Sequence, residues 1–176
     1  MKKKLKKIKI VVSDVDGVLT DGKIYLGGGE ELKSFWSKDA PRTAVLLRSG
    51  IPLVLFTARK CSAVERRAGE LKVDLIYKQA INDTGKDLFD VLGEKYKVQP
   101  EEVLYIGDDW SDLYCMHKAG VAVTPADGSR ENKKVADIVT NATGGHGVIA
   151  EVAEIIMRAQ NTWNSHTNSY VTKLTY

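Results

Sequence analysis

Short apolar runs recur along the chain, each rich in branched aliphatic residues and each only three to five residues long. They lie at residues 8–12, 52–56, 73–76, 103–106 and 121–123. Runs of this length and composition are typical of strands that are buried on both faces of a parallel sheet. The pattern therefore predicts five buried strands.

The segments between these runs carry apolar residues at helical spacing. Leu88, Leu92 and Tyr96 recur every four residues, and Val148 and Val152 continue the same spacing near the end of the chain. Because strands and helices alternate, we expect an α/β fold, a Rossmann-like parallel sheet with helices on both faces. We expect residues 1–160 to form a single domain and residues 161–176 to be a polar C-terminal tail.

One segment departs from this alternation. Residues 23–26 and 30–35 have the composition of two strands, and glycines at 27–29 separate them. We interpret residues 23–36 as a β-hairpin inserted after the first strand.

Composition excludes several classes of protein. With 43% hydrophobic residues among 176, the chain can bury one substantial core. Five lysines within residues 1–7 supply much of the net charge of +3, and a solvated terminus explains them without a nucleic-acid partner. No apolar stretch approaches the roughly 20 residues of a membrane helix, so we expect no membrane partner and a cytoplasmic protein. Cys61 and Cys115 lack metal-ligand spacing and fit a reducing compartment.

Polar side chains follow several of the predicted strands, at the edge of the sheet where α/β proteins bind ligands. Asp14 and Asp16 follow the first strand, Thr57 follows the second, and Asp108 follows the fourth. Lys86 lies at the start of the helix before that fourth strand. Alternate residues of an extended segment point the same way, so both Asp14 and Asp16 can face one ligand.

Carboxylates that converge from two strand ends repel each other unless a cation lies between them, and their hard oxygen ligands suit Mg²⁺. A hydroxyl and an ammonium beside such a cluster suit phosphoryl oxygens. Each signal alone has a plainer explanation, because a strand-end aspartate often caps a helix and a lone lysine is usually solvated. Together they indicate phosphoryl chemistry.

The ordered set resembles the four motifs of the haloacid dehalogenase superfamily: Asp-Val-Asp-Gly-Val at 14–18, Thr57, Lys86, and Gly-Asp-Asp-x-x-x-Asp from Gly107. The resemblance implies a phosphatase in which Asp14 attacks phosphorus to form an aspartyl-phosphate. Asp16 then protonates the leaving alcohol and later activates water.

The same resemblance implies the ligands of the site. Mg²⁺ is held by the Asp14 carboxylate, the Asp16 backbone carbonyl and the Asp108 carboxylate, while Thr57 and Lys86 hold the phosphoryl oxygens. Asp109 and Asp112 orient these groups.

Neither gap between the motifs has room for the cap domain that many members of the superfamily carry. Finer motifs at residues 21–25, 49–51, 57–60, 105–109 and 144–147 resemble the capless subgroup that includes 3-deoxy-D-manno-octulosonate 8-phosphate phosphatase. That resemblance implies this substrate, an intermediate of lipopolysaccharide precursor synthesis. It also implies a homotetramer in which the hairpin builds a central barrel and a neighbouring chain closes each site. The alternative for the hairpin is a solvated flap.

Arg59 lies where the subgroup that acts on the eight-carbon sugar acid usually has arginine, and relatives that act on nine-carbon acids often have glutamate. A guanidinium suits a carboxylate-bearing substrate. We therefore expect Arg59 to bind the substrate together with Thr57 and Lys86.

Three departures from the family pattern keep alternatives open. Pro41 falls at the first turn of a helix, where the family has a glycine-containing stretch. The Asp-Lys-Gly that the family usually has around its third motif is Asp-Thr-Gly-Lys at 83–86 in this chain. The segment 144–151 lacks the arginine of the corresponding family motif. His146 in that segment could reach a neighbouring site or be a solvated loop residue. The alternatives are a phosphatase of a nine-carbon sialic-acid-type phosphate and a non-catalytic assembly module.

Overall fold

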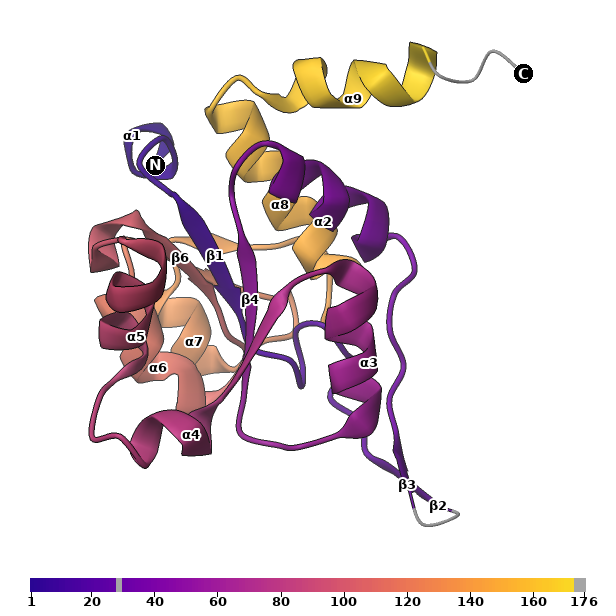
Figure 1. Ribbon diagram of the computed structural model, residues 1–176, viewed down its shortest axis with the longest axis vertical. Coiled ribbons are helices and arrows are strands. Elements are labelled where there is room, and N and C mark those ends of the chain that lie inside the picture. Colours follow the sequence, from indigo (N-terminus) through magenta and orange to yellow (C-terminus); the bar gives the residue numbers. More distant parts are fainter. Residues whose placement is uncertain (28–29, 173–176) are drawn as a thin grey trace.

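The structure is a computed structural model that describes residues 1–27 and 30–172. Within these ranges, six parallel strands form one sheet in the order β5-β4-β1-β6-β7-β8 (Figure 1). The strands are β1 (Ile10–Ser13), β4 (Leu53–Thr57), β5 (Asp74–Tyr77), β6 (Val103–Ile106), β7 (Val121–Thr124) and β8 (Ile138–Val139). The five predicted strands are confirmed, whereas the two-residue β8 is too short to leave a hydrophobic run in the sequence.

Helices cover both faces of this sheet, as the alternation predicts (Figure 1). One face carries α1 (Lys2–Leu5), α2 (Asp39–Arg48), α3 (Ser62–Leu71) and α8 (Val148–Ala159), and the other carries α4 (Lys78–Asn82), α5 (Leu88–Tyr96), α6 (Leu113–Lys118) and α7 (Arg130–Val135). The fold is therefore a doubly wound α/β domain.

Two hydrophobic cores form because successive strand residues point to opposite faces. Val11 and Leu55 belong to the core beneath α2, α3 and α8. Val12 and Val54 belong to the core beneath α5 and α6. All four are at most 1% exposed, so β1 and β4 are enclosed on both faces. This explains why their sequences are continuous apolar runs without alternation.

Both ends of α2 have a local explanation in the sequence. Pro41 lies in the first turn, where its missing N–H group costs no hydrogen bond. The helix ends at Arg48, and Gly50 follows with a φ of +87°, a conformation that glycine adopts without strain.

The hairpin consists of β2 (Tyr25–Gly27) and β3 (Glu30–Leu32), paired antiparallel with Tyr25 opposite Leu32. It extends from the body of the molecule near the start of α3 (Figure 1). The predicted glycine turn includes residues 28 and 29, which lie outside the described ranges. The second strand ends earlier than expected, because Phe35 returns to pack against the core.

Part of the predicted tail forms the helix α9 (Trp163–Thr172). The Trp163 side chain packs against the core, and the Arg158 guanidinium lies 5.0 Å from its ring centroid. This local anchoring explains why no helical periodicity is visible in the sequence.

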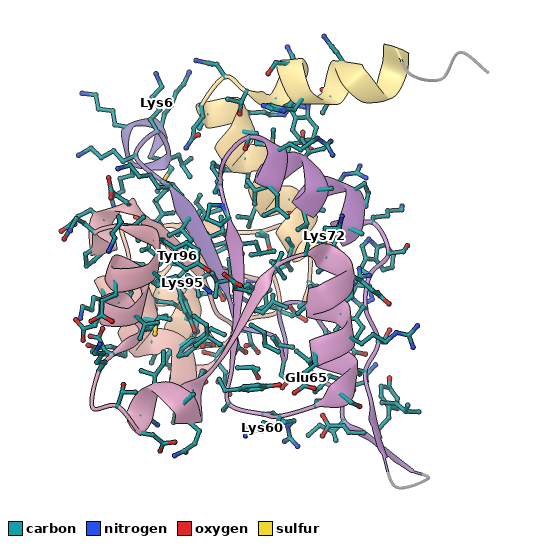
Figure 2. The ribbon with its side chains drawn as sticks, in the orientation of Figure 1. Lys6, Lys60, Glu65, Lys72, Lys95 and Tyr96 are labelled. Atoms are coloured by element: carbon teal, nitrogen blue, oxygen red, sulfur yellow. The ribbon has the colours of Figure 1, made fainter. Side chains whose placement is uncertain are left out.

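At the other terminus, the N-terminal lysines lie at the surface. Lys6 of the segment after α1 points away from the body (Figure 2). Lys4 contacts Asp137 at 2.8 Å, so one of the lysines is paired within the chain. Among the described residues, no helix combines the length and the apolar composition that crossing a membrane requires.

Candidate active site

A pocket of about 600 Å³ opens at the carboxyl edge of the sheet. Its walls come from the ends of β1, β4 and β6 and from the start of α4. The lining residues that carry functional groups are Asp14, Asp16, Thr57, Arg59, Lys78, Asp108, Asp109 and Ser111. The strand order explains the convergence, because β1 lies between β4 and β6 in the sheet.

Three carboxylates form a compact cluster in this pocket. Asp14, Asp108 and Asp112 each offer an oxygen within 4.8 Å of the others. Asp14 is 7% exposed and Asp112 is fully buried. Such a cluster of hard oxygen donors fits Mg²⁺, with Asp14 and Asp108 at the pocket wall as the side chains that can hold it.

Burial and mutual repulsion disfavour the ionised forms of these carboxylates, so a nearby positive charge stabilises the cluster. Burial and the negative charge of Asp112 raise the pKa of Asp14 well above its usual range. Burial, again followed by Asp112, raises the pKa of Asp108 to about 7. Lys78 acts against both effects on Asp14. A divalent cation between these carboxylates would favour their ionised forms.

Asp112 is fixed from several directions. Its carboxylate accepts hydrogen bonds from the Tyr105 hydroxyl at 2.8 Å and from the Asp108 backbone N–H at 3.1 Å. Gly107 makes the approach possible, since a Cβ atom there would lie 2.3 Å from the Asp112 Cβ. Asp112 therefore orients the loop that carries Asp108.

Gly17 is required by the same cluster. It has a φ of +88°, and a Cβ atom built there would lie 2.0 Å from an Asp108 carboxylate oxygen. The glycine of the Asp-Val-Asp-Gly segment thus lets the first loop turn and lets Asp108 approach it.

Lys78, the first residue of α4, brings an ammonium to the buried end of the pocket. Its Nζ atom lies 3.6 Å from Asp14 and 3.4 Å from Asp112. Burial alone would lower the pKa of Lys78, but the charges of Asp14 and Asp112 outweigh it and raise the pKa. The side chain is thus held as a cation beside the most buried carboxylates.

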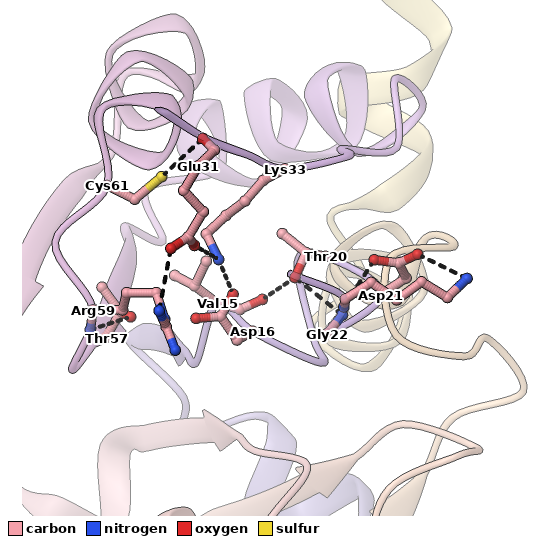
Figure 3. A network of polar contacts seen from close by, with 11 residues as sticks. Val15, Asp16, Thr20, Asp21, Gly22, Glu31, Lys33, Thr57, Arg59 and Cys61 are labelled. Carbon is pink, nitrogen blue, oxygen red and sulfur yellow. Dashed lines mark hydrogen bonds and ion pairs between the residues drawn. The ribbon is translucent and has the colours of Figure 1, made fainter. Parts of the chain in front are cut away.

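A second group of charges forms the outer wall (Figure 3). Lys33, which follows β3, contacts the Asp16 carboxylate, and its Nζ atom lies 2.7 Å from a Glu31 carboxylate oxygen. The other oxygen of Glu31 lies 3.1 Å from Nη1 of Arg59. The hairpin therefore reaches the pocket of its own chain through two charged side chains.

Comparisons with known proteins agree with this geometry. Residues 88–152 match the family of haloacid dehalogenase-like hydrolases. The chain is 39% identical over 158 residues to the 3-deoxy-D-manno-octulosonate 8-phosphate phosphatase of Escherichia coli (strain K12), an alignment that covers 89% of this chain and 83% of that protein. The relative of the same name from Yersinia pestis is 37% identical over 155 residues, covering 88% and 82%.

A solved structure of this phosphatase from Moraxella catarrhalis, in complex with magnesium ion, phosphate ion and KDO molecule, aligns with a TM-score of 0.88 and 34% identity, covering 96% of this chain and 97% of that one. The cobalt-bound enzyme from Haemophilus influenzae aligns with a TM-score of 0.85 and 29% identity, covering 97% and 99%. The chain belongs to the 3-deoxy-D-manno-octulosonate 8-phosphate phosphatase family. The expectation of a phosphatase is thereby confirmed, and the non-catalytic module is set aside.

Residues of three of the four motifs lie together in the pocket, as the resemblance implies. Asp14, Asp16, Thr57 and Asp108 all line the pocket, and so does Arg59. Thr57 is 2% exposed, and its hydroxyl accepts a hydrogen bond from the backbone N–H of Arg59 at 3.2 Å.

The third motif requires a correction. Lys86 does not line the pocket, because its Nζ atom pairs with Glu94 at 2.6 Å on the surface of α5. Lys78 supplies the ammonium in its place. The sequence contained a signal for this, since Lys78 follows the third apolar run almost directly, and residues after strand ends are the ones that reach the ligand.

Two further residues complete the comparison with expectation. Lys33 was not predicted as a site residue, although Glu31 and Lys33 are alternate residues of the strand predicted at 30–35, a spacing that places both side chains on one face. His146 lies outside the residues that line the pocket and is exposed. Its Nδ1 atom lies 2.8 Å from the Gly144 carbonyl oxygen, and its ring faces Trp36 at 5.5 Å between centroids.

Proposed function

We propose that this phosphatase hydrolyses 3-deoxy-D-manno-octulosonate 8-phosphate in a Mg²⁺-dependent reaction. The observation that carries the proposal is that Lys78 and Asp108 both lie beside Asp14, in a family whose named members are phosphatases of this substrate. The proposal further assigns the reaction to lipopolysaccharide precursor synthesis. Both described cysteines are free and buried, which is consistent with a reducing cytoplasm.

The first step is the transfer of the phosphoryl group to the protein. An Asp14 oxygen attacks phosphorus, the bond between phosphorus and the sugar oxygen breaks, and Asp16 gives its proton to the departing oxygen. Thr57 and Lys78 bind phosphoryl oxygens and stabilise their charge. The proposal assigns Asp14, the Asp16 carbonyl and Asp108 to Mg²⁺, which neutralises charge on the phosphoryl group and the carboxylates when bound.

The second step releases phosphate. Asp16, now ionised, takes a proton from a water molecule, and the resulting oxygen attacks phosphorus. The bond between Asp14 and phosphorus breaks, so both carboxylates return to their starting states. Lys33 contacts the carboxylate that moves the proton and limits its orientations.

The open pocket supports a further part of the proposal, a homotetramer in which a neighbouring chain covers the site. Tyr25 and Leu32 lie opposite each other on the hairpin and are 45% and 61% exposed. Burying these side chains against other copies of the hairpin would remove apolar surface from water.

The proposed function is tested by measuring phosphate release from a panel of sugar-acid phosphates, with Mg²⁺ and with EDTA. We expect the highest kcat/KM for the eight-carbon acid and loss of turnover with EDTA. A higher kcat/KM for a nine-carbon sialic-acid-type 9-phosphate would transfer the proposal to that substrate. The oligomeric mass measured by light scattering tests the tetramer separately.

A further inference from the structure

The outer wall of the pocket holds an arginine that is already paired. Arg59 is the cation at the solvent side of the pocket, whereas Lys78 lies at the buried end beside Asp14. The two cations therefore suit two anionic groups of one ligand, a phosphoryl group inside and a carboxylate outside. In the structure, however, the Arg59 guanidinium contacts the Glu31 carboxylate at 3.1 Å.

Glu31 is held in this position from its other side. One carboxylate oxygen lies 2.7 Å from Lys33, and the backbone carbonyl accepts a weak contact from the Cys61 thiol at 3.8 Å. Lys33 is itself enclosed, with no exposed side-chain surface. The carboxylate thus bridges two cations and stays in front of Arg59 (Figure 3).

Glu31 lies between the two cations of this group, with one carboxylate oxygen on Lys33 and the other on Arg59. Hydrogen bonding from Lys33 lowers the pKa of Glu31, with a smaller contribution from Arg59. An incoming anion therefore meets a neutralised guanidinium.

We propose that Glu31 is an internal competitor for Arg59, which the carboxylate of the substrate displaces when it binds. This inference rests on the proposed function, because it assumes a substrate with both a phosphoryl group and a carboxylate. Glu31 then sets how strongly the outer part of the pocket attracts a second anion. It has no part in the bond-breaking steps at Asp14.

The competition discriminates between substrate classes. A sugar phosphate without a carboxylate leaves the Glu31–Arg59 pair in place and gains nothing at the outer wall. A phosphorylated sugar acid exchanges one carboxylate partner of Arg59 for another, and Glu31 keeps Lys33 as its own partner. Removing the charge of Glu31 should therefore strengthen the binding of a phosphorylated sugar acid and leave the binding of a sugar phosphate without a carboxylate unchanged.

The test uses two esters that differ at one carbon, 6-phosphogluconate, with a carboxylate, and sorbitol 6-phosphate, with a hydroxymethyl group. Both are measured as substrates and as competitive inhibitors of p-nitrophenyl phosphate hydrolysis. In Glu31→Gln we expect KM or Ki for the acid to fall about two- to five-fold, the range of a partly exposed ion pair. The values for sorbitol 6-phosphate should stay within about 1.5-fold, on the same reasoning.

Two further variants keep the test decisive. Glu31→Asp retains the charge but shortens the side chain, so it should also favour the acid, and it serves if the glutamine variant does not fold. Glu154→Gln removes a charge from another glutamate–arginine pair, with Arg158 on α8, and should change neither ester. Equal changes for both esters in the Glu31 variants would overturn the inference.

A double-mutant cycle locates the effect at Arg59. In an Arg59→Gln background, Glu31→Gln should no longer improve binding of 6-phosphogluconate, and persistence of the improvement would also overturn the inference. The result is separable from the proposed function. If the eight-carbon acid phosphate is not preferred but the matched esters respond as expected, the proposed substrate fails while the competition stands.

Discussion

The Nζ atom of Lys78 lies 3.6 Å from the Oδ1 atom of Asp14, at the buried end of the pocket. This relationship joins the carboxyl end of β1 to the start of α4, across β4 and β5 in the sheet. It places a positive charge beside the proposed nucleophile, at the position that was expected for Lys86 from the sequence.

Lys78→Met should lower kcat/KM by about 10²–10³-fold, because it removes a cation that stabilises charge on the phosphoryl group. The matched control is Lys86→Met, which removes a lysine paired with Glu94 at the surface. We expect that control to retain activity within about twofold, as for other surface substitutions. Steady-state hydrolysis of p-nitrophenyl phosphate measures both, and a larger loss in Lys86→Met would contradict the assignment.

Asp14→Asn should reduce turnover by roughly 10³-fold or more, since an amide cannot form the aspartyl-phosphate. The substitution is nearly isosteric, so the far-ultraviolet circular dichroism and the oligomeric mass should not change. Acid-quenched samples of the wild type should contain phosphate bound to protein, and those of the variant should not. Retention of that adduct in Asp14→Asn would exclude this residue as the nucleophile.

Mg²⁺ binding should weaken as the pH falls below about 7. The pKa of Asp108 is raised to about 7 in the metal-free protein, so at lower pH the metal must displace a proton from it. For this one proton, the apparent Kd should rise about tenfold per pH unit below that pKa. Isothermal titration of the metal at pH 6 and pH 8 measures this.

Thermal unfolding gives an independent readout of the same site, because a metal that binds only the folded state raises Tm. The increase should be larger at pH 8 than at pH 6. Asp108→Asn, which lacks the ionisable ligand, should lose most of the increase at both values of pH. Equal affinity at pH 6 and pH 8 in the wild type would rule out competition by a proton.

Asp39 predicts a pH dependence of stability outside the active site. It is 1% exposed, its carboxylate accepts a hydrogen bond from the Ala150 N–H at 3.0 Å, and burial raises its pKa to about 6. The folded state therefore binds more protons than the unfolded state between about pH 4 and pH 6. Over that window, as the pH rises, this group reduces the free energy of unfolding by about 3 kcal/mol.

Asp39→Asn keeps an oxygen acceptor for Ala150 but lacks the buried charge. The free energy of unfolding of the variant minus that of the wild type should increase by about 3 kcal/mol from pH 4 to pH 7, as measured by urea denaturation. Asp83→Asn, at an exposed position, is the control and should shift the difference by less than about 0.5 kcal/mol. A constant difference between Asp39→Asn and wild type would contradict the prediction.

The sheet and its helices were predictable because each core position has one physical requirement, an apolar side chain at the right period. The strands with continuous apolar runs, such as β1 and β4, are recognisable for that reason. The tail helix α9 and the short strand β8 were not predictable in this way. Their positions depend on a few tertiary contacts, such as Trp163 against Arg158, that leave no period in the sequence.

The residues of the candidate site were predictable where they follow a predicted strand and not predictable elsewhere. Asp14, Thr57 and Asp108 directly follow predicted strands, so their convergence follows from the order of the strands. Lys86 was inferred from its place at the start of a predicted helix and from the resemblance to the third motif, and neither of these fixes the direction of a side chain. Lys33 lies on the hairpin, whose orientation toward the pocket no local pattern specifies.

The central strands β1 and β6 and the hairpin differ in local stability, because only the strands are enclosed on both faces. Amide protons of β1 and β6 are enclosed on both faces and should exchange with solvent only when the whole domain unfolds. The hairpin that carries Glu31 has one pairing strand and exposed side chains, so it should exchange through local opening. Substitutions in the hairpin can therefore alter which substrates bind, while the strands that position Asp14 and Asp108 keep their geometry.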